Sequence, residues 1–269
     1  MAKSRFEYVR NYERDQILLP NTYILIRVDG RGFHRFSTHY QFQKPNDERA
    51  LRLMNASAEA VMGQIAEICG AYGQSDEFSF IFNRTCSLFD RRESKLVSTV
   101  ASTFTAHYIF LWNKYFPDTS LEPSMLPTFD SRAVLYPSAM EVRDYFSWRQ
   151  ADCHINNLYN TSFWALVQSG KSEQEAEQAL MGTNSADKNE LLFSQFQINY
   201  NNIEPLYRKG TMLIRKLKSP PVSKYLQKPE KSQRQLDREA HRQRKADIVL
   251  LHDDIIGDKF WDECSTWLI

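Results

Sequence analysis

The clearest pattern near the start of the chain is a short, almost continuous apolar run. Tyr23 to Val28 is rich in branched residues and ends at Asp29-Gly30-Arg31-Gly32, where polar residues and glycines indicate a loop. The run predicts a buried strand with an acidic end. A second apolar run, Ala133 to Tyr136, predicts another strand before Pro137.

Helical spacing follows the first run. Asn46 or Asp47 can cap a helix whose apolar residues recur at positions 51, 54, 58, 61, 62, 65 and 68, and Gly70 would end it. Residues 72–82 then have the pattern of a hairpin, with a polar tip from Gln74 to Glu77. A strand, a helix and a hairpin in this order predict an α+β fold, an α/β sandwich with helices packed on a sheet.

Two longer helices are predicted downstream of the hairpin. Apolar residues recur at helical spacing over residues 91–113, and residues 141–168 are aromatic and helical in character. Ser172 and Glu175 form a capping box for a further helix. The composition changes after residue 214, because residues 215–247 are rich in Lys, Arg and Gln and poor in large apolar side chains. This segment is predicted to be mobile, with order resuming near Ile248.

Charge and composition exclude several classes of protein. The 269 residues carry 34 Lys and Arg against 33 Asp and Glu, so the net charge of +1 gives no signal of polyanion binding. This total hides an uneven distribution, since residues 215–245 alone contain 11 Lys and Arg and 3 Asp and Glu. No apolar run is long enough to span a membrane and no signal peptide is recognisable, which predicts a cytoplasmic or nuclear protein. The four scattered cysteines indicate reduced thiols rather than a zinc site or a disulfide framework.

The first candidate site is a pair of acidic tips, Asp29 after one strand and Asp76-Glu77 in the hairpin turn. Carboxylates at adjacent strand ends suit two magnesium ions, which take oxygen ligands and leave positions for substrate phosphates. Gly30 and Gly32 would let the backbone approach a triphosphate. Either acidic tip alone is more typical of a solvated turn, but the two together favour a nucleotide site.

Two basic groups could hold phosphates. Arg91, Arg92 and Lys95 stand at the start of a predicted helix, where cations oppose the helix dipole, so a bound triphosphate would explain them. A solvated basic face explains them equally well. Lys44, before Pro45-Asn46-Asp47, has the same phosphate interpretation with weaker support.

The third candidate site is the polar stretch from Asp152 to Thr161. It holds three Asn, a His and a Tyr, which are poor helix formers but suit hydrogen bonding and stacking with exposed RNA bases. A buried polar network that fixes helix packing is an equally good interpretation.

These motifs together resemble the eukaryotic tRNA-His guanylyltransferase family. The resemblance extends from Ala2 to about Ile214, and the segment after it matches much less well. Its marks are Arg27-Val28-Asp29-Gly30, Lys44-Pro45-Asn46-Asp47, Gly73 to Glu77, Trp148-Arg149-Gln150 with His154 to Asn160, and Asn199-Tyr200-Asn201-Asn202.

The resemblance implies a palm-type catalytic domain over residues 1–138, similar to that of polymerases and cyclases. Residues 139–214 would be a helical tRNA-binding part continuous with the catalytic core, followed by the basic segment 215–247 and a C-terminal segment 248–269. Family members add a guanosine to the 5′ end of tRNA-His, in the reverse of the usual direction. ATP adenylylates the 5′-phosphate, the GTP 3′-hydroxyl attacks it, and pyrophosphate is then removed.

The same resemblance implies roles for individual residues. Asp29, Asp76 and the Gly30 carbonyl would bind two Mg²⁺ ions, and Glu77 would lie beside them in a role left open. The triphosphate would be lined by a set of neighbouring residues, Asp29, Gly30, Arg31, Gly32, Phe33, His34 and Ser75. The tRNA would contact His154, Asn157 and Lys188, and the family implies a homotetramer.

Two other functions compete with this one. A non-catalytic tRNA-binding protein on a palm scaffold would explain the Asn-rich stretch and the basic segment, but the intact acids argue against it. A nucleotide cyclase would share the acids and leave residues 154–160 unexplained.

Overall fold

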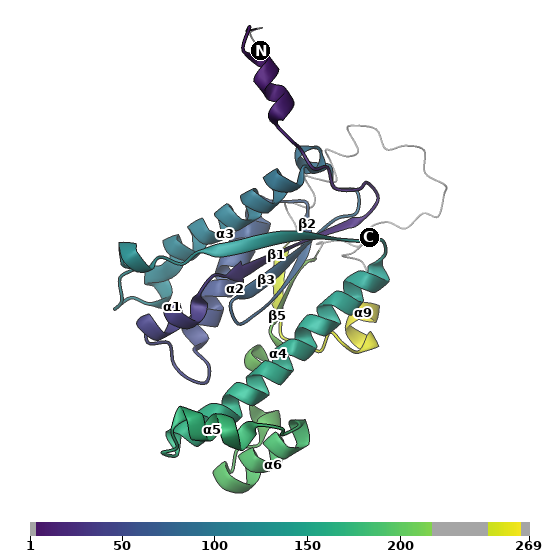
Figure 1. Cartoon of the computed structure of the whole chain (residues 1–269). Helices are drawn as coiled ribbons and strands as arrows, with labels where there is room; N and C mark the ends of the chain where they lie inside the picture. The colour runs from purple at the N-terminus through teal and green to yellow at the C-terminus, as the bar shows by residue number, and fades with distance from the viewer. Residues whose placement is uncertain (1–3, 217–246, 265–269) are drawn as a thin grey trace.

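A six-stranded antiparallel sheet forms the centre of the molecule. It is seen in a computed structural model that describes residues 4–216 and 247–264, with strand order β4-β1-β3-β2-β5-β6. The first four strands and the helices between them follow the order βαββαβ, in which each helix connects two parallel strands that have a third strand between them. This layered arrangement of helices and antiparallel sheet agrees with the predicted α+β class (Figure 1).

The strands are β1 (Tyr23–Gly30), β2 (Ile68–Gln74), β3 (Glu77–Phe82), β4 (Phe129–Tyr136), β5 (Thr211–Lys216) and β6 (Asp247–Leu251). The α-helices are α1 (Phe33–His39), α2 (Glu48–Gln64), α3 (Glu93–Tyr115), α4 (Ala139–Gln168), α5 (Glu173–Leu180), α6 (Ser185–Phe196), α7 (Pro205–Lys209) and α9 (Asp258–Cys264). Short 3-10 turns are η1 (Glu7–Tyr12), η2 (Leu88–Arg91), η3 (Pro123–Met125) and η4 (Tyr200–Asn202).

The two faces of the sheet are covered by different helices. Successive side chains of a strand point to opposite faces. Ile24, Ile26 and Val28 of β1 therefore share one buried cluster with α2 and α3, while Tyr23 and Leu25 share the other with α4. On the α4 side, the same strand continues with Arg27 and Asp29, so this face changes from apolar to charged toward the end of β1.

Helix α4 leads from the sheet to a small helical part. It crosses the sheet at its start and then extends to α5 and α6, as Figure 1 shows. Two small clusters hold α5 and α6 against α4, one around Leu192 and Tyr200 and the other around Ala176 and Leu180. The capping box predicted at Ser172 and Glu175 begins α5.

The C-terminal segment is part of the main core. Strands β5 and β6 extend the sheet beside β2, and Ile255, Phe260 and Trp261 are buried with α4 residues. The Gln150 amide group reinforces this packing, because it donates to the carbonyls of Lys209 and Asp253 and accepts from the Ile255 amide.

Several predicted boundaries are wrong. Helix α2 ends at Gln64, and Ile68 and Gly70 lie in β2, because a strand buried on both faces continues the apolar pattern of the helix before it. The ends of the segment predicted to be mobile are ordered, since residues 215–216 belong to β5 and residue 247 to β6. The rest of that prediction, residues 217–246, lies outside the described residues.

Two predicted absences can be compared with the described residues. Within residues 4–216 and 247–264, no helix is long and apolar enough to cross a membrane. Cys69, Cys86 and Cys153 are buried free thiols.

Candidate active site

The two acidic tips meet at one edge of the sheet. The antiparallel register places Asp29 of β1 directly opposite Glu77 of β3. Asp76 lies in the tight turn before Glu77, and its carbonyl accepts a 3.0 Å hydrogen bond from the Gly30 amide. The structure therefore brings Asp29 and Gly30 next to Ser75, Asp76 and Glu77. Asp29 and Asp76 are 47 residues apart along the chain.

Gly30 is required by the close approach of this turn. A Cβ atom there would lie 2.8 Å from the Asp76 Oδ2 and 2.4 Å from the Phe33 ring. Burial raises the pKa of Asp76, and the nearby Asp29 carboxylate raises it further. A bound cation would relieve this unfavourable charge, so the electrostatics of the pair suit a metal ion.

The donor atoms at this edge fit magnesium. Two carboxylates and a main-chain carbonyl provide oxygen ligands only, which hard cations prefer. Among the described residues, no group of three or more His, Cys, Asp or Glu side chains could hold a metal ion. A magnesium ion here would therefore take its remaining ligands from water or from nucleotide phosphates, as is usual for this ion.

A helix begins immediately after the acidic end of β1. Gly32 precedes α1 with a φ of 67°, and no side chain caps the helix. Its first amides, from Phe33 onward, can therefore donate to an anion near Asp29. The Phe33 ring is buried among Phe36, Tyr108 and Phe129, so only the backbone of Phe33 can meet a ligand. Arg31 and His34 are exposed at this edge.

Glu77 differs from the other two acids because it is paired with two arginines. Its side chain is buried and forms ion pairs with Arg27 and Arg149; the Arg149 Nη1 lies 3.2 and 3.1 Å from its two oxygens. Arg27 also pairs with Asp29, and Arg149 pairs with Asp152 at 3.3 Å. Burial raises the pKa of Glu77, while the charges of Arg149 and Arg27 act in the opposite direction.

The candidate site residues named from the sequence did not include these two arginines. Arg27 had a detectable signal, because it is the one charged residue in the run Tyr23 to Val28 and lies two positions before Asp29, on the same face. Arg149 had no local signal of this kind, although it stands in Trp148-Arg149-Gln150, one of the motifs that carry the family resemblance. Its side chain reaches Glu77 from a helix 72 residues away.

The basic group predicted at the start of α3 lies at the other end of β1. Arg91 is buried and donates to the carbonyls of Leu18, Cys86, Leu19 and Thr22. Thr22 and Asp29 are separated by seven residues of strand, roughly 23 Å. The structure thus contradicts the interpretation of Arg91 as a triphosphate ligand, because its guanidinium is used to bind backbone carbonyls. For Arg92 and Lys95 the contact with a triphosphate stays a prediction. Arg92 pairs with Asp15 at the start of α3, and within a single chain neither residue lies beside the acids.

The residues predicted to contact tRNA lie on or near α4. His154 is half-buried against the Tyr200 ring, and burial together with the charge of Arg208 lowers the pKa of its imidazole. The Lys188 ammonium donates to the carbonyl and the hydroxyl of Thr183 at 2.8 Å. Asn157 is buried, with both ends of its amide bonded inside the protein. For Asn157 the structure therefore favours the buried polar network over the RNA contact.

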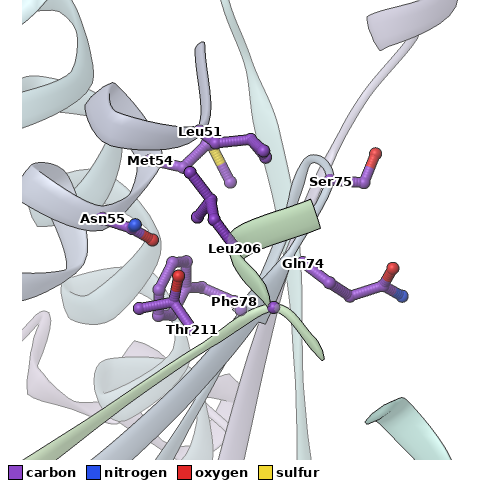
Figure 2. Close-up of a pocket in the computed structure, with 10 residues that line it drawn as sticks. Leu51, Met54, Asn55, Gln74, Ser75, Phe78, Leu206 and Thr211 are labelled. Atoms are coloured by element: carbon purple, nitrogen blue, oxygen red, sulfur yellow. The ribbon is translucent and has the colours of Figure 1, made fainter. Parts of the chain in front are cut away.

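A small pocket lies beside the acidic turn. Leu51, Met54 and Leu206 group on one side of it, next to the Ser75 turn, and the Gln74 side chain points away from them (Figure 2). The volume that the centre of a water molecule can occupy in this pocket is about 10 Å³, so the pocket holds about one water molecule. A nucleotide at the acids would therefore lie on the open edge of the sheet rather than in this pocket.

Comparison with known proteins gives a consistent result along the chain. The family model described as tRNAHis guanylyltransferase matches residues 6–137, and that of the Thg1 C terminal domain matches residues 140–257. The tRNA(His) guanylyltransferase of Debaryomyces hansenii is 53% identical over 270 residues, which cover 100% of both chains. That of Schizosaccharomyces pombe is 49% identical over 262 residues, covering 97% of this chain and 96% of the relative.

Solved structures agree with these sequence matches. The crystal structure of the Saccharomyces cerevisiae tRNA(His) guanylyltransferase is similar with a TM-score of 0.76 and 48% identity, over 78% of this chain and 93% of that one. A bacterial tRNA(His) guanylyltransferase-like protein in complex with ATP is similar in fold, with a TM-score of 0.71 and 22% identity, over 98% of this chain and 97% of that one.

Proposed function

Because this chain belongs to the tRNAHis guanylyltransferase family, and is thus a nucleotidyltransferase, we propose that it adds a guanosine to the 5′ end of tRNA-His. The family predicted from the sequence motifs is confirmed. The proposed reaction runs in the 3′-to-5′ direction. The 5′-phosphate attacks ATP and releases pyrophosphate, the GTP 3′-hydroxyl then attacks the activated 5′-phosphate and releases AMP, and pyrophosphate is finally removed from the triphosphate of the added guanosine. The observation that supports it best is that Asp29 and Asp76, both half-buried, are brought together by the hydrogen bond from the Gly30 amide to the Asp76 carbonyl.

In this proposal the sheet edge acts as a palm that holds two Mg²⁺ ions. Asp29, Asp76 and the Gly30 carbonyl would bind them, and the ions would neutralise phosphate charge and lower the pKa of the attacking hydroxyl. Phosphoryl transfer depends mainly on position and charge, so no covalent nucleophile is needed. Glu77 would act through Arg27, which it holds beside Asp29.

The triphosphate of GTP or ATP would lie across the start of α1. The amides after Gly32, the exposed Arg31 and His34, and Ser75 are its proposed partners, and Lys44 would approach from the loop before α2. His154 and Lys188 would contact tRNA-His, and a homotetramer would bring Arg92 and Lys95 of a second copy toward the site. Light scattering of the purified protein tests the tetramer.

The reaction is tested with 5′-phosphorylated tRNA-His, ATP, labelled GTP and magnesium. We expect Asp29→Asn and Asp76→Asn to lose transfer by at least about 1000-fold, since phosphoryl transfer without bound metal loses several kcal/mol of charge stabilisation. Asp144→Asn is the matched control, because Asp144 is exposed on α4, away from the sheet edge. Transfer by either of the first two variants at the wild-type rate would contradict the proposed site.

Other tRNAs in the same assay test the substrate. Transfer to tRNA-His alone is expected, and equal transfer to tRNAs with other anticodons would contradict tRNA-His as the specific substrate.

A further inference from the structure

The Asn157 amide links two parts of the protein that are distant in sequence. Its Nδ2 donates to the Asn46 Oδ1 at 2.8 Å, and its Oδ1 accepts from the Tyr200 hydroxyl at 3.1 Å. The side chain is 7% exposed, so solvent and RNA have little access to it. A buried amide with both ends bonded is costly to disrupt, because its partners are then left unsatisfied.

Asn46 belongs to the loop of residues 43–47, the last part of the connection between α1 and α2. Trp164 and Gln168 of α4 also contact this loop. They follow Asn157 by seven and eleven residues, so all three side chains lie on one face of the helix. The Gln168 amide donates to the Lys44 carbonyl at 3.3 Å, and the Lys44 ammonium lies 5.7 Å from the centre of the Trp164 ring. Helix α4 therefore supports the loop along about three turns.

The other side of the loop is connected to the acidic edge. Phe42, just before the loop, packs edge-on against Phe36 of α1, the helix that begins beside Asp29. At the end of the loop, Asp47 accepts from the amides of Gln43 and Arg49 and caps α2. The Tyr108 ring packs edge-on against Phe33 and Phe36 of α1, with ring centres 5.9 and 6.3 Å apart, so the start of α1 and Phe42 belong to one aromatic cluster.

We propose that Asn157 is a positioning residue for nucleotide binding, which holds the loop of residues 43–47, and with it Lys44, against α4 beside the acidic edge. This inference rests on the proposed function, in which Lys44 meets the triphosphate. It replaces the role in tRNA contact that the sequence predicted for Asn157. A loop released from α4 would have to be ordered again each time a nucleotide binds, which weakens binding without changing the chemical step.

The test compares four variants: Asn157→Ala, Asn46→Ala, the double variant, and Tyr200→Phe. Loss of one buried hydrogen bond should raise the KM for nucleotide about tenfold, with kcat at saturating nucleotide within about twofold of wild type. Asn46→Ala should act like Asn157→Ala, and the double variant should be no worse than either one. Tyr200→Phe keeps the bond to the loop and should leave KM unchanged, as should the control Asn113→Ala on the exposed end of α3.

Two further measurements separate positioning from RNA contact. Hydrogen exchange of the peptide covering residues 42–50 should be faster in Asn157→Ala and Asn46→Ala than in wild type. The Kd for tRNA-His should stay within about twofold. An unchanged nucleotide KM together with weaker tRNA binding in Asn157→Ala would overturn the inference, as would multiplicative losses in the double variant.

Failure of the proposed function is recognised separately. If the wild-type protein transfers no guanosine, the proposed reaction is wrong, and binding of a fluorescent GTP analogue then replaces KM as the readout. Wild-type-like binding of the analogue by both Asn46→Ala and Asn157→Ala would overturn the positioning role in that case. If Asn157→Ala fails to fold, Asn46→Ala still tests the link from the loop side, with Tyr200→Phe as the control that keeps the bond to the loop.

Discussion

The substitution Glu77→Gln separates two roles for this acid that the sequence left open. Glu77 is 6% exposed and forms ion pairs with two guanidinium groups, those of Arg27 and Arg149. Arg149 is itself only 4% exposed. Glutamine has the same shape without the charge. The variant should therefore leave Arg149 with Asp152 alone, and Arg27 with Asp29 alone.

The cost can be worked out from these contacts. Removing one partner of a buried ion pair costs about 3–5 kcal/mol, because the other charge stays buried. Each arginine here keeps a second carboxylate, and Asp152 is one-third exposed, so solvent screens that pair. We therefore expect a loss of about 2–3 kcal/mol, which lowers Tm by roughly 4–10 °C in a chain of this size.

Thermal and urea unfolding followed by circular dichroism measure this loss. Glu177→Gln is the matched control, because Glu177 is exposed on α5. The pair Glu77→Gln and Arg149→Met in one protein should recover part of the stability, since an apolar replacement removes the unpaired charge. A Glu77→Gln protein that melts within about 1 °C of wild type but transfers no guanosine would refute the reasoning, and would indicate direct action on metal or substrate.

Three further predictions follow from the described residues. Trp261→Ala should lower the free energy of unfolding in urea by about 3 kcal/mol, because the ring is buried against α4 and donates to the Ile255 carbonyl. A loss below about 1 kcal/mol would mean that the C-terminal segment is not part of the core. Burial raises the pKa of Cys69 and of Cys153 to about 12, so both thiols should resist iodoacetamide at pH 8 until the protein unfolds, and mass spectrometry of the alkylated peptides checks this. Burial and the charge of Arg208 lower the pKa of His154, so the unfolded chain takes up a proton before the folded protein as the pH falls below about 7. The free energy of unfolding should therefore decrease as the pH falls from about 7.5 to 5.5. His154→Gln should show a smaller decrease, and an equal slope would contradict this role of His154.

Local patterns predicted the elements that lie closest to the candidate site. The apolar run before Asp29, the hairpin tip at Asp76, and the two amphipathic helices are properties of short stretches, and β1, β2, β3, α2 and α3 correspond to them. The short helix α1 and the strands β5 and β6 were not predicted. Strand β5 is buried beside β2, which lies more than 130 residues earlier in the chain. Strand β6 pairs only with β5, so its formation depends on β5 being in place.

The sequence by itself determined which residue types carry the chemistry. It placed acids at two strand ends, glycines beside them and a polar stretch on a later helix, because side-chain periodicity and turn residues act over a few positions. That Glu77 pairs with two arginines, that Arg91 binds backbone carbonyls and that Asn157 is bonded to Asn46 were decided only by the tertiary structure. Those outcomes depend on contacts such as Arg149 to Glu77 and Asn157 to Asn46, across 72 and 111 residues, and no local pattern specifies which distant group will be buried beside a given side chain.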